Sequence, residues 1–354
     1  MSILQQMMAF GHERVCFHHD EDTGLRAIVA IHSTVLGNAL GGTRRWHYAS
    51  ETEAIYNVLR LSEGMTYKAA AAGLAMGGAK SVVLLPGRGS PGSEAEARAL
   101  GRFVDTFSGN YIAAEDVGTT PEYVDWMAME TPHVMGGDRV SRGGDPSPFT
   151  AQGVVNSMKA CLAHLGRPVD FSGLTVAIQG VGSVGQNVGR IMVENGAKIV
   201  VADICESSTK MMAEQFDAKV VSTEEIFTSA CDIFSPCALG GVISAMNVPS
   251  LQCDIVCGGA NNVLQDPEED AAALYRRGIL YAPDFVANAG GLIELAGLHL
   301  GMTREELDDR NAGIEDTTLH VLKMTKDVVS SHQAAVKFAT DRIAVAKQEN
   351  VHAH

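Results

Sequence analysis

The chain has 354 residues, of which 46% are hydrophobic and 19% charged, and its formal net charge is −15. This length and composition are typical of a folded two-domain protein and exclude an intrinsically disordered one. The negative charge argues against nucleic acid or an anionic membrane surface as a partner. No apolar run reaches the roughly 18 residues of a membrane helix, and the first residues do not resemble a signal peptide, so we expect a cytoplasmic protein.

The cysteines and histidines carry no recognisable metal or disulfide pattern. The seven cysteines are scattered without CxxC pairs, and the twelve histidines include no HExxH motif. Cys253 and Cys257 lie four residues apart in an expected strand, which separates them too far for a disulfide. We therefore expect reduced thiols and no metal site.

A first block of alternating strand and helix patterns covers the N-terminal part of the chain. Short β-branched or apolar runs predict strands at Leu25–Ile31, Ser81–Leu85 and Tyr111–Ala114. Apolar residues at helical spacing predict helices at Glu51–Leu61 and Glu94–Phe107. The block therefore predicts a small α/β domain.

A stretch rich in glycine, proline and aspartate, Gly136–Pro148, interrupts all periodicity and is our candidate hinge. A long helix is expected at Phe149–Leu165, and from Thr303 onward the chain has amphipathic helical patterns. Between them, strand and helix patterns alternate again, with a helix at Gln186–Glu194. The expected strands are Leu174–Gln179, Lys198–Ala202, Ala218–Val221, Ile233–Phe234, Ile255–Cys257 and Leu280–Ala282.

This alternation predicts an α/β protein of two domains. Residues 1–145 would form the first α/β domain. Residues 146–331 would form a second domain of the Rossmann type, with a parallel, doubly wound sheet.

Gly180–Gly185 matches the dinucleotide fingerprint G-x-G-x-x-G, between an expected strand and an expected helix. Gly180 permits a tight turn, Gly182 lets the backbone approach the pyrophosphate, and Gly185 lets the helix pack closely on the strand. Asp203, 23 residues after Gly180, would bind the adenosine ribose and repel a 2′-phosphate, so we expect NAD rather than NADP. The expected cofactor-binding residues of the turn are Gly180, Val181, Gly182, Ser183, Val184 and Gly185.

Three polar residues of the first block are candidates for the chemistry. Lys68 and Lys80 each lie in apolar, glycine-containing surroundings, with Lys80 expected just before a strand, and Asp116 follows an expected strand. Burial and a second nearby cation would lower the pKa of a lysine toward neutrality, as a general base requires.

A series of short motifs runs in order through nearly the whole chain. They are Leu40-Gly41-Gly42-Thr43-Arg44, Gly64-Met65-Thr66-Tyr67-Lys68, Gly73 to Lys80, Ala114-Glu115-Asp116-Val117-Gly118, Asp145 to Ala151, the fingerprint, Ala260-Asn261-Asn262, Ala282-Pro283-Asp284 and Asn288-Ala289-Gly290-Gly291. In these motifs the chain resembles the leucine/phenylalanine/valine dehydrogenase branch of the amino acid dehydrogenases. Ala79, where a glycine is usual, Arg45 and the segment Leu295-Ala296-Gly297-Leu298-His299 depart from that pattern.

The resemblance implies that residues 1–145 serve substrate binding, catalysis and oligomerisation, and that residues 146–331 bind NAD across a cleft from them. It also implies that the C-terminal helix, from about residue 332, packs back on the first domain.

Each matching residue has an implied role. Lys80 would activate the water that attacks the imino acid, and Asp116 would exchange protons with the amino group. Lys68, assisted by Asn261, would bind the substrate α-carboxylate. Thr150 would hold the nicotinamide carboxamide. The further residues expected at substrate are Leu40, Gly41, Met65, Ala114, Leu292 and Leu295, and Asn262 is expected at the cofactor.

The substrate implied is an apolar L-amino acid, deaminated with NAD to the 2-oxo acid and ammonia. In the glutamate enzymes of the family a lysine precedes the paired glycines, where this chain has Leu40. An apolar residue there disfavours burial of a second carboxylate. The sequence favours a branched-chain, leucine-like substrate and leaves open an aromatic one, phenylalanine or tryptophan, and, from another class, a non-catalytic NAD-binding redox sensor. The partners expected are the small-molecule substrates and further copies of the chain in a homo-oligomer.

Overall fold

The computed structural model describes residues 2–87, 89–139, 145–325 and 330–352. The chain divides into two compact units. The first comprises residues 1–144, 295–301 and 339–354, and the second comprises residues 145–294 and 302–338. Part of the predicted hinge, residues 140–144, lies outside the described residues. No described helix is long and apolar enough to cross a membrane.

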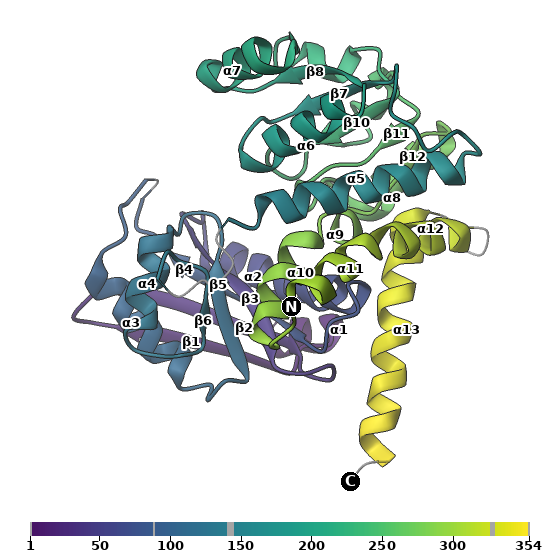
Figure 1. The fold of residues 1–354 in the computed structure, drawn as a ribbon. Coiled ribbons are helices and arrows are strands. Elements are labelled where there is room, and N and C mark those ends of the chain that lie inside the picture. The colour runs from purple at the N-terminus through teal and green to yellow at the C-terminus, as the bar shows by residue number, and fades with distance from the viewer. Residues whose placement is uncertain (1, 88, 140–144, 326–329, 353–354) are drawn as a thin grey trace. The chain divides into compact units, whose positions relative to one another are not determined.

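The first unit is built on a sheet in the order β1-β2-β4-β3-β5-β6 (Figure 1). β1 and β2 are antiparallel, β2 is antiparallel to β4, and β3, β4, β5 and β6 are mutually parallel. The elements are α1 (Ile3–Phe10), β1 (Arg14–Asp20), β2 (Leu25–Ser33), β3 (Ala39–Trp46), α2 (Glu51–Ala71), β4 (Gly77–Leu84), α3 (Glu94–Asp105), β5 (Tyr111–Glu115), α4 (Pro121–Ala128) and β6 (Val134–Met135).

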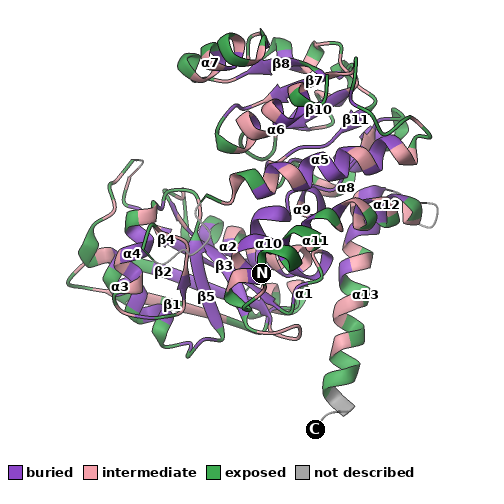
Figure 2. Ribbon diagram, in the orientation of Figure 1, coloured by how far each residue is buried: buried purple, intermediate pink, exposed green. Residues whose placement is uncertain are grey.

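Helices cover both faces of this sheet. On one face, α2 buries Ile55, Val58 and Leu59 against Ile28 and Val82 of the strands. On the other face, α3 and α4 contribute a second apolar cluster that includes Leu100, Phe103, Val104, Val124 and Met127. Figure 2 shows β5, which lies between these layers, as buried along most of its length.

The second unit contains a fully parallel sheet in the order β9-β8-β7-β10-β11-β12, the strand order of dinucleotide-binding Rossmann folds. The predicted α/β class, with a Rossmann-type second domain, is therefore confirmed. The elements are α5 (Ser147–His164), β7 (Thr175–Gln179), α6 (Ser183–Glu194), β8 (Lys198–Ala202), α7 (Glu206–Phe216), β9 (Lys219–Val220), η1 (Glu225–Thr228), β10 (Ile233–Pro236), η2 (Val248–Ser250), β11 (Ile255–Val256), α8 (Pro267–Arg276), β12 (Leu280–Tyr281), α9 (Asp284–Ala287), α10 (Gly290–His299), α11 (Arg304–Ala312), α12 (Ile314–Met324) and α13 (Ser331–His352). The last residues of α10 and of α13 are assigned to the first unit.

Several element bounds differ from the sequence prediction. The strand expected at Ser81–Leu85 begins at Gly77, so Lys80 lies within β4, and its predicted place before the strand is wrong. β3, which contains the Gly41-Gly42 pair, is a central strand that the apolar pattern does not predict. α2 continues ten residues beyond the predicted end, from Leu61 to Ala71, and therefore includes Met65 and Lys68.

Candidate active site

Lys80 and Asp116 form a buried ion pair in the first unit. The Lys80 Nζ lies 3.0 Å from the Asp116 Oδ2, and the two side chains are 7% and 14% exposed. Lys80 is on the same side of β4 as Val82, which packs with α2, whereas Asp116 directly follows β5. The sheet therefore brings together the two residues expected to move protons, although they are distant in sequence.

Arg44, which the sequence analysis did not single out, completes this cluster. Its Nε lies 2.9 Å from the same Asp116 oxygen that contacts Lys80. The residues of β3 alternate between faces, so Leu40, Gly42 and Arg44 share one face. That alternation is the sequence signal that could have identified Arg44, but it requires β3 to be recognised as a strand.

The burial and charges of this cluster shift the pKa values of its members. Burial lowers the pKa of the Lys80 ammonium, Asp116 raises it, and Arg44 lowers it further, so the net direction is downward. Burial alone would raise the pKa of Asp116, but Lys80 and Arg44 together lower it to about 2. At neutral pH Asp116 is therefore a carboxylate, and Lys80 gives up its proton more readily than an exposed lysine.

The paired glycines of β3 are required by close packing. A Cβ on Gly42 would lie 2.8 Å from the Cβ of Asp116 and 3.1 Å from the Nζ of Lys80. A Cβ on Gly41 would lie 1.7 Å from the carbonyl oxygen of Ala79 in β4. The glycines therefore let the ion pair and the neighbouring strand approach β3, and they form no turn there.

Hydrogen bonds beneath the cluster connect β3, β4 and β5. The Tyr111 hydroxyl donates to the Gly41 carbonyl at 3.0 Å and to the Ser81 Oγ at 2.9 Å. The Ser81 hydroxyl in turn donates to the Thr43 Oγ1 at 2.8 Å. Because all these groups are buried, they fix the relative register of the three strands that carry the site.

The residues predicted to bind substrate in this unit lie on the elements around the cluster. Leu40 is 2% exposed and Ala114 is 8% exposed, and Ala114 is paired with Gly42 across the β3–β5 ladder. Met65 and Lys68 lie three residues apart on α2 and so share one side of that helix; both are half-buried. Leu295 is half-buried and belongs to the part of α10 in the first unit.

In the second unit, the predicted residues Asn261 and Asn262 form an exposed loop. The buried Asn288 amide donates to the Asn261 Oδ1 at 2.8 Å and to the Ala260 carbonyl at 3.1 Å. Asn288 therefore orients Asn261, a contact that the sequence analysis missed. Leu292 is buried, and Thr150 donates to the Pro146 carbonyl at 3.1 Å within the first turn of α5.

The dinucleotide fingerprint forms the turn between β7 and α6. Gly180 has φ +90°, and a Cβ on Gly185 would lie 2.0 Å from the Gly180 carbonyl oxygen, so both positions require glycine. No atom lies within 4 Å of a Cβ on Gly182, the N-cap of α6, and no side chain caps this helix. This open, uncapped helix N-terminus fits the pyrophosphate of a dinucleotide.

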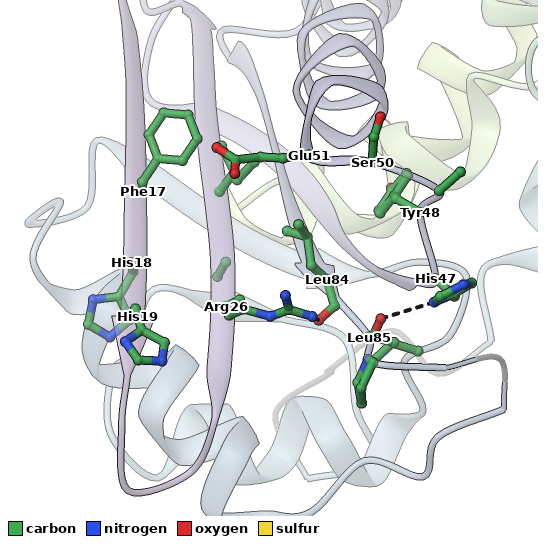
Figure 3. Close-up of a pocket in the computed structure, with 14 residues that line it drawn as sticks. Phe17, His18, His19, Arg26, His47, Tyr48, Ser50, Glu51, Leu84 and Leu85 are labelled. Atoms are coloured by element: carbon green, nitrogen blue, oxygen red, sulfur yellow. Dashed lines mark hydrogen bonds between the residues drawn. The ribbon is translucent and has the colours of Figure 1, made fainter.

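A separate hollow of about 590 Å³ lies on the first unit, between β1, β2 and the segment before α2 (Figure 3). Its lining includes His19, Arg26, Tyr48 and Glu51, and the His47 ring contacts the Leu85 carbonyl at 3.2 Å. None of the predicted site residues lines it. Among the described residues no group of three or more His, Cys, Asp or Glu side chains is placed to hold a metal ion.

The chain matches the models of one enzyme family over almost its whole length. Residues 12–133 match the Glu/Leu/Phe/Val dehydrogenase dimerisation domain, and residues 145–205 and 201–350 match the glutamate/leucine/phenylalanine/valine dehydrogenase model. The chain is 42% identical over 350 residues to a leucine dehydrogenase of Thermoactinomyces intermedius, which covers 98% of this chain and 95% of the relative.

Relatives named for aromatic substrates are nearly as similar to this chain as the leucine dehydrogenase is. A phenylalanine dehydrogenase of Bacillus thermotolerans is 39% identical over 96% of this chain and 90% of its own length. The crystal structure of an L-tryptophan dehydrogenase from Nostoc punctiforme has a TM-score of 0.84 and 37% identity, covering 98% of this chain and 99% of its own. The chain belongs to the Glu/Leu/Phe/Val dehydrogenase family and is an amino acid dehydrogenase that works with a nicotinamide cofactor.

Proposed function

We propose that the chain catalyses the NAD-dependent, reversible oxidative deamination of an apolar L-amino acid to its 2-oxo acid and ammonia. The observation that carries this proposal is the buried Lys80–Asp116 pair on a sheet whose same face presents Leu40. The pair supplies a base and a proton carrier, and Leu40 supplies an apolar surface beside them. The names of the full-length leucine, tryptophan and phenylalanine dehydrogenase relatives support the same substrate class.

In the proposed mechanism each polar residue of the first unit has one task. Lys68 binds the substrate α-carboxylate, and Asp116 exchanges protons with the substrate amino group. A bound nicotinamide cofactor would supply the acceptor for the hydride that leaves the substrate Cα. Lys80, as a neutral amine, takes a proton from the water that attacks the resulting imine at carbon. Its lowered pKa supports this task, since a base must be unprotonated near the working pH.

The proposed roles in the second unit concern the cofactor and the remaining substrate contacts. Thr150 holds the nicotinamide carboxamide, and Asn261, oriented by Asn288, assists at the carboxylate. Leu292, like Leu295 of the first unit, contributes apolar surface. Asp203 binds the adenosine ribose and repels the additional phosphate of NADP, which favours NAD.

The preferred side chain is the open part of the proposal. The leucine dehydrogenase relatives favour a branched-chain substrate, whereas the fit to the Nostoc punctiforme L-tryptophan dehydrogenase structure favours an aromatic one. Hydrophobic pockets discriminate by only about 1–3 kcal/mol per methylene, so close relatives can differ in preference. We propose a branched-chain amino acid as the first candidate substrate and an aromatic amino acid as the second.

We also propose that the chain works as a homo-oligomer. The family model matched by residues 12–133 is described as a dimerisation domain, and residues 145–205 and 201–350 match the dehydrogenase model. Size-exclusion chromatography with light scattering measures the mass of the particle directly. A monomer at micromolar concentration would contradict this part of the proposal.

The test of the function is turnover of an amino acid panel followed by NADH absorbance at 340 nm. The panel contains leucine, valine, isoleucine, phenylalanine, tryptophan, glutamate and alanine. We expect turnover of an apolar member, lowered at least 100-fold in Lys80→Ala and unchanged in Lys198→Ala, a control at an exposed position. NADH binding without turnover of any amino acid in the panel would contradict the proposed catalytic function and favour a non-catalytic NAD-binding redox sensor.

A further inference from the structure

One carboxylate oxygen in the candidate site is shared by two cations. The Asp116 Oδ2 lies 2.9 Å from the Arg44 Nε and 3.0 Å from the Lys80 Nζ. All three side chains are mostly buried, with exposures of 20% for Arg44, 7% for Lys80 and 14% for Asp116. The cluster therefore carries one positive charge more than its carboxylate balances when both cations are protonated.

Only one of the two cations is able to relieve this imbalance. An arginine guanidinium does not lose its proton in proteins, whereas a buried lysine ammonium does so readily. If Arg44 were absent, Lys80 and Asp116 would form a balanced pair, and Asp116 would hold Lys80 in its protonated form. With Arg44 present, the loss of a proton from Lys80 leaves a balanced Arg44–Asp116 pair.

We propose that Arg44 is a positioning residue that binds the Asp116 carboxylate and thereby frees Lys80 to act as a neutral base. This inference rests on the proposed function, in which Lys80 is the base. Arg44 also fixes the place of the carboxylate, because it reaches Asp116 from β3 while the Thr119 hydroxyl accepts from the Asp116 backbone N–H at 2.8 Å. The Asp116 side chain is thus held from its backbone and from its carboxylate.

The charges that shift the pKa values of Lys80 and Asp116 are those of these two residues and of Arg44. Tyr48, which precedes α2, and Tyr111, on β5, both have a raised pKa, chiefly through burial, so they stay neutral at working pH. The Glu53 carboxylate of α2 contributes to the raised pKa of Tyr48. Glu115, the last residue of β5, is exposed. Lys68 is a further cation on α2, the helix that packs on this face of the sheet. A neutral variant at Arg44 therefore tests the effect of the Arg44 charge on Lys80 while the other charged residues stay in place.

The experiment is the pH profile of kcat/KM for Arg44→Met, with saturating NAD and the best amino acid of the panel. Activity requires neutral Lys80, so it rises with pH through the pKa of that amine. Removal of Arg44 removes a cation that lowers this pKa, so the rising limb moves to higher pH. We expect the limb to shift by about one pH unit. At pH values below the limb kcat/KM would then fall about tenfold, and at pH values above the limb it would recover.

Two further variants separate a charge effect from a structural one. Arg44→Lys keeps a cation and should restore most of the shift, although it lacks the planar guanidinium. Arg98→Met removes an exposed arginine of α3 that pairs with Glu94 and Glu130, and its profile should match that of the wild-type protein. A uniform loss of activity at every pH in Arg44→Met, without a shift of the limb, would overturn the proposal.

A second measurement reads Lys80 without relying on turnover. The rate at which cyanate carbamylates Lys80, followed by peptide mass spectrometry across pH, reports the fraction of neutral amine. The midpoint should lie about one pH unit higher in Arg44→Met than in the wild-type protein, with Arg44→Lys between them. If no panel member is turned over, the proposed function fails and this titration still decides the role of Arg44. An unmoved midpoint overturns that role. If Arg44→Met does not fold, Arg44→Gln replaces it.

Discussion

Asp203, directly after β8, accepts a hydrogen bond at 2.7 Å from the backbone N–H of Val181 in the fingerprint turn. Its other carboxylate oxygen accepts from the Cys205 N–H at 2.9 Å. The residue expected to select the cofactor therefore also holds the turn on which the pyrophosphate would bind. An ionised carboxylate has about four acceptor sites, so both contacts leave capacity for ribose hydroxyls.

Two variants of Asp203 should separate these roles. Asp203→Asn keeps an acceptor for the Val181 N–H, but it loses the acceptor for the exposed Cys205 N–H and the charge that repels a 2′-phosphate. We expect its preference for NAD over NADP, measured as the ratio of kcat/KM values, to fall at least tenfold with little change in thermal stability. Asp203→Ala also loses the backbone contact and should lose about 1–2 kcal/mol of stability. NADP remaining unused by Asp203→Asn would show that another group selects the cofactor.

The glycines of the fingerprint should respond differently to alanine. At Gly182 the added Cβ meets open space and φ is −71°, so Gly182→Ala should fold normally. The methyl group would occupy the space into which the pyrophosphate fits, so we expect NADH binding to weaken at least tenfold by fluorescence titration. Gly185→Ala places a Cβ 2.0 Å from the Gly180 carbonyl and should lower the melting temperature clearly. Unchanged NADH affinity in Gly182→Ala would contradict a phosphate site at this turn.

The sequence predicts the second unit better than the first, for a physical reason. The strands of a parallel sheet buried on both faces are short apolar runs, and Lys198–Ala202 is such a run with the same bounds in the structure. β3 has no such run, because Gly41 and Gly42 are needed for the approach of β4, Asp116 and Lys80. Glycine pairs are typical of turns and ligand-binding loops, but in β3 and β4 they are packing positions.

The sequence also identifies some residues of the candidate site and not others. Lys80 and Asp116 can be identified in the sequence because charged residues are unusual in apolar surroundings. They lie close together because β4, which carries Lys80, and β5, which Asp116 follows, flank β3 in one sheet. Arg44 contacts a residue 72 positions away, and Asn288 contacts Asn261 across 27 positions. Such contacts depend on the strand register and on the packing of α9, which periodicity in a single sequence does not determine.

Removal of the Asp116 charge should destabilise the first unit as well as inactivate the enzyme. In Asp116→Asn, Lys80 and Arg44 remain as adjacent, mostly buried cations without a counter-charge. We expect a loss of about 3 kcal/mol in urea unfolding and at least a 100-fold fall in kcat. The double variant Asp116→Asn with Arg44→Met removes one cation and should be more stable than Asp116→Asn alone. The reverse order of stability would contradict the charge balance inferred for the cluster.

Leu40 should decide between apolar and acidic side chains. Leu40→Lys places an ammonium at a position that is 2% exposed in an apolar wall. We expect kcat/KM for leucine to fall at least 100-fold and the ratio of glutamate to leucine activity to rise at least tenfold. Leu40→Met, which keeps the volume, should cost less than about 1.5 kcal/mol of stability and keep the substrate order. An unchanged glutamate to leucine ratio in Leu40→Lys would remove Leu40 from the substrate pocket.

Two buried histidines should make the first unit sensitive to acid. The rings of His12 and His32 lie 4.8 Å apart, both residues are 8% exposed, and they contact Ser62 and Thr66 of α2 at 2.8 Å. Burial, with His32 nearby, lowers the pKa of His12 to about 4, and burial also lowers that of His32. Both rings are therefore neutral in the folded protein at pH 7.

In the unfolded chain these histidines have a pKa of about 6.5, so the unfolded state binds more protons below that pH. The contribution of His12 is complete above about pH 6.5 and is lost as the pH falls toward 4, and the contribution of His32 is lost in the same direction. Each histidine gives a slope of up to about 1.4 kcal/mol per pH unit. Urea unfolding at pH 7.5 and pH 5 should show a smaller acid loss for His12→Gln than for the wild-type protein, with the exposed control His299→Gln unchanged. Equal losses in all three proteins would mean that the His12–His32 pair does not set the acid stability.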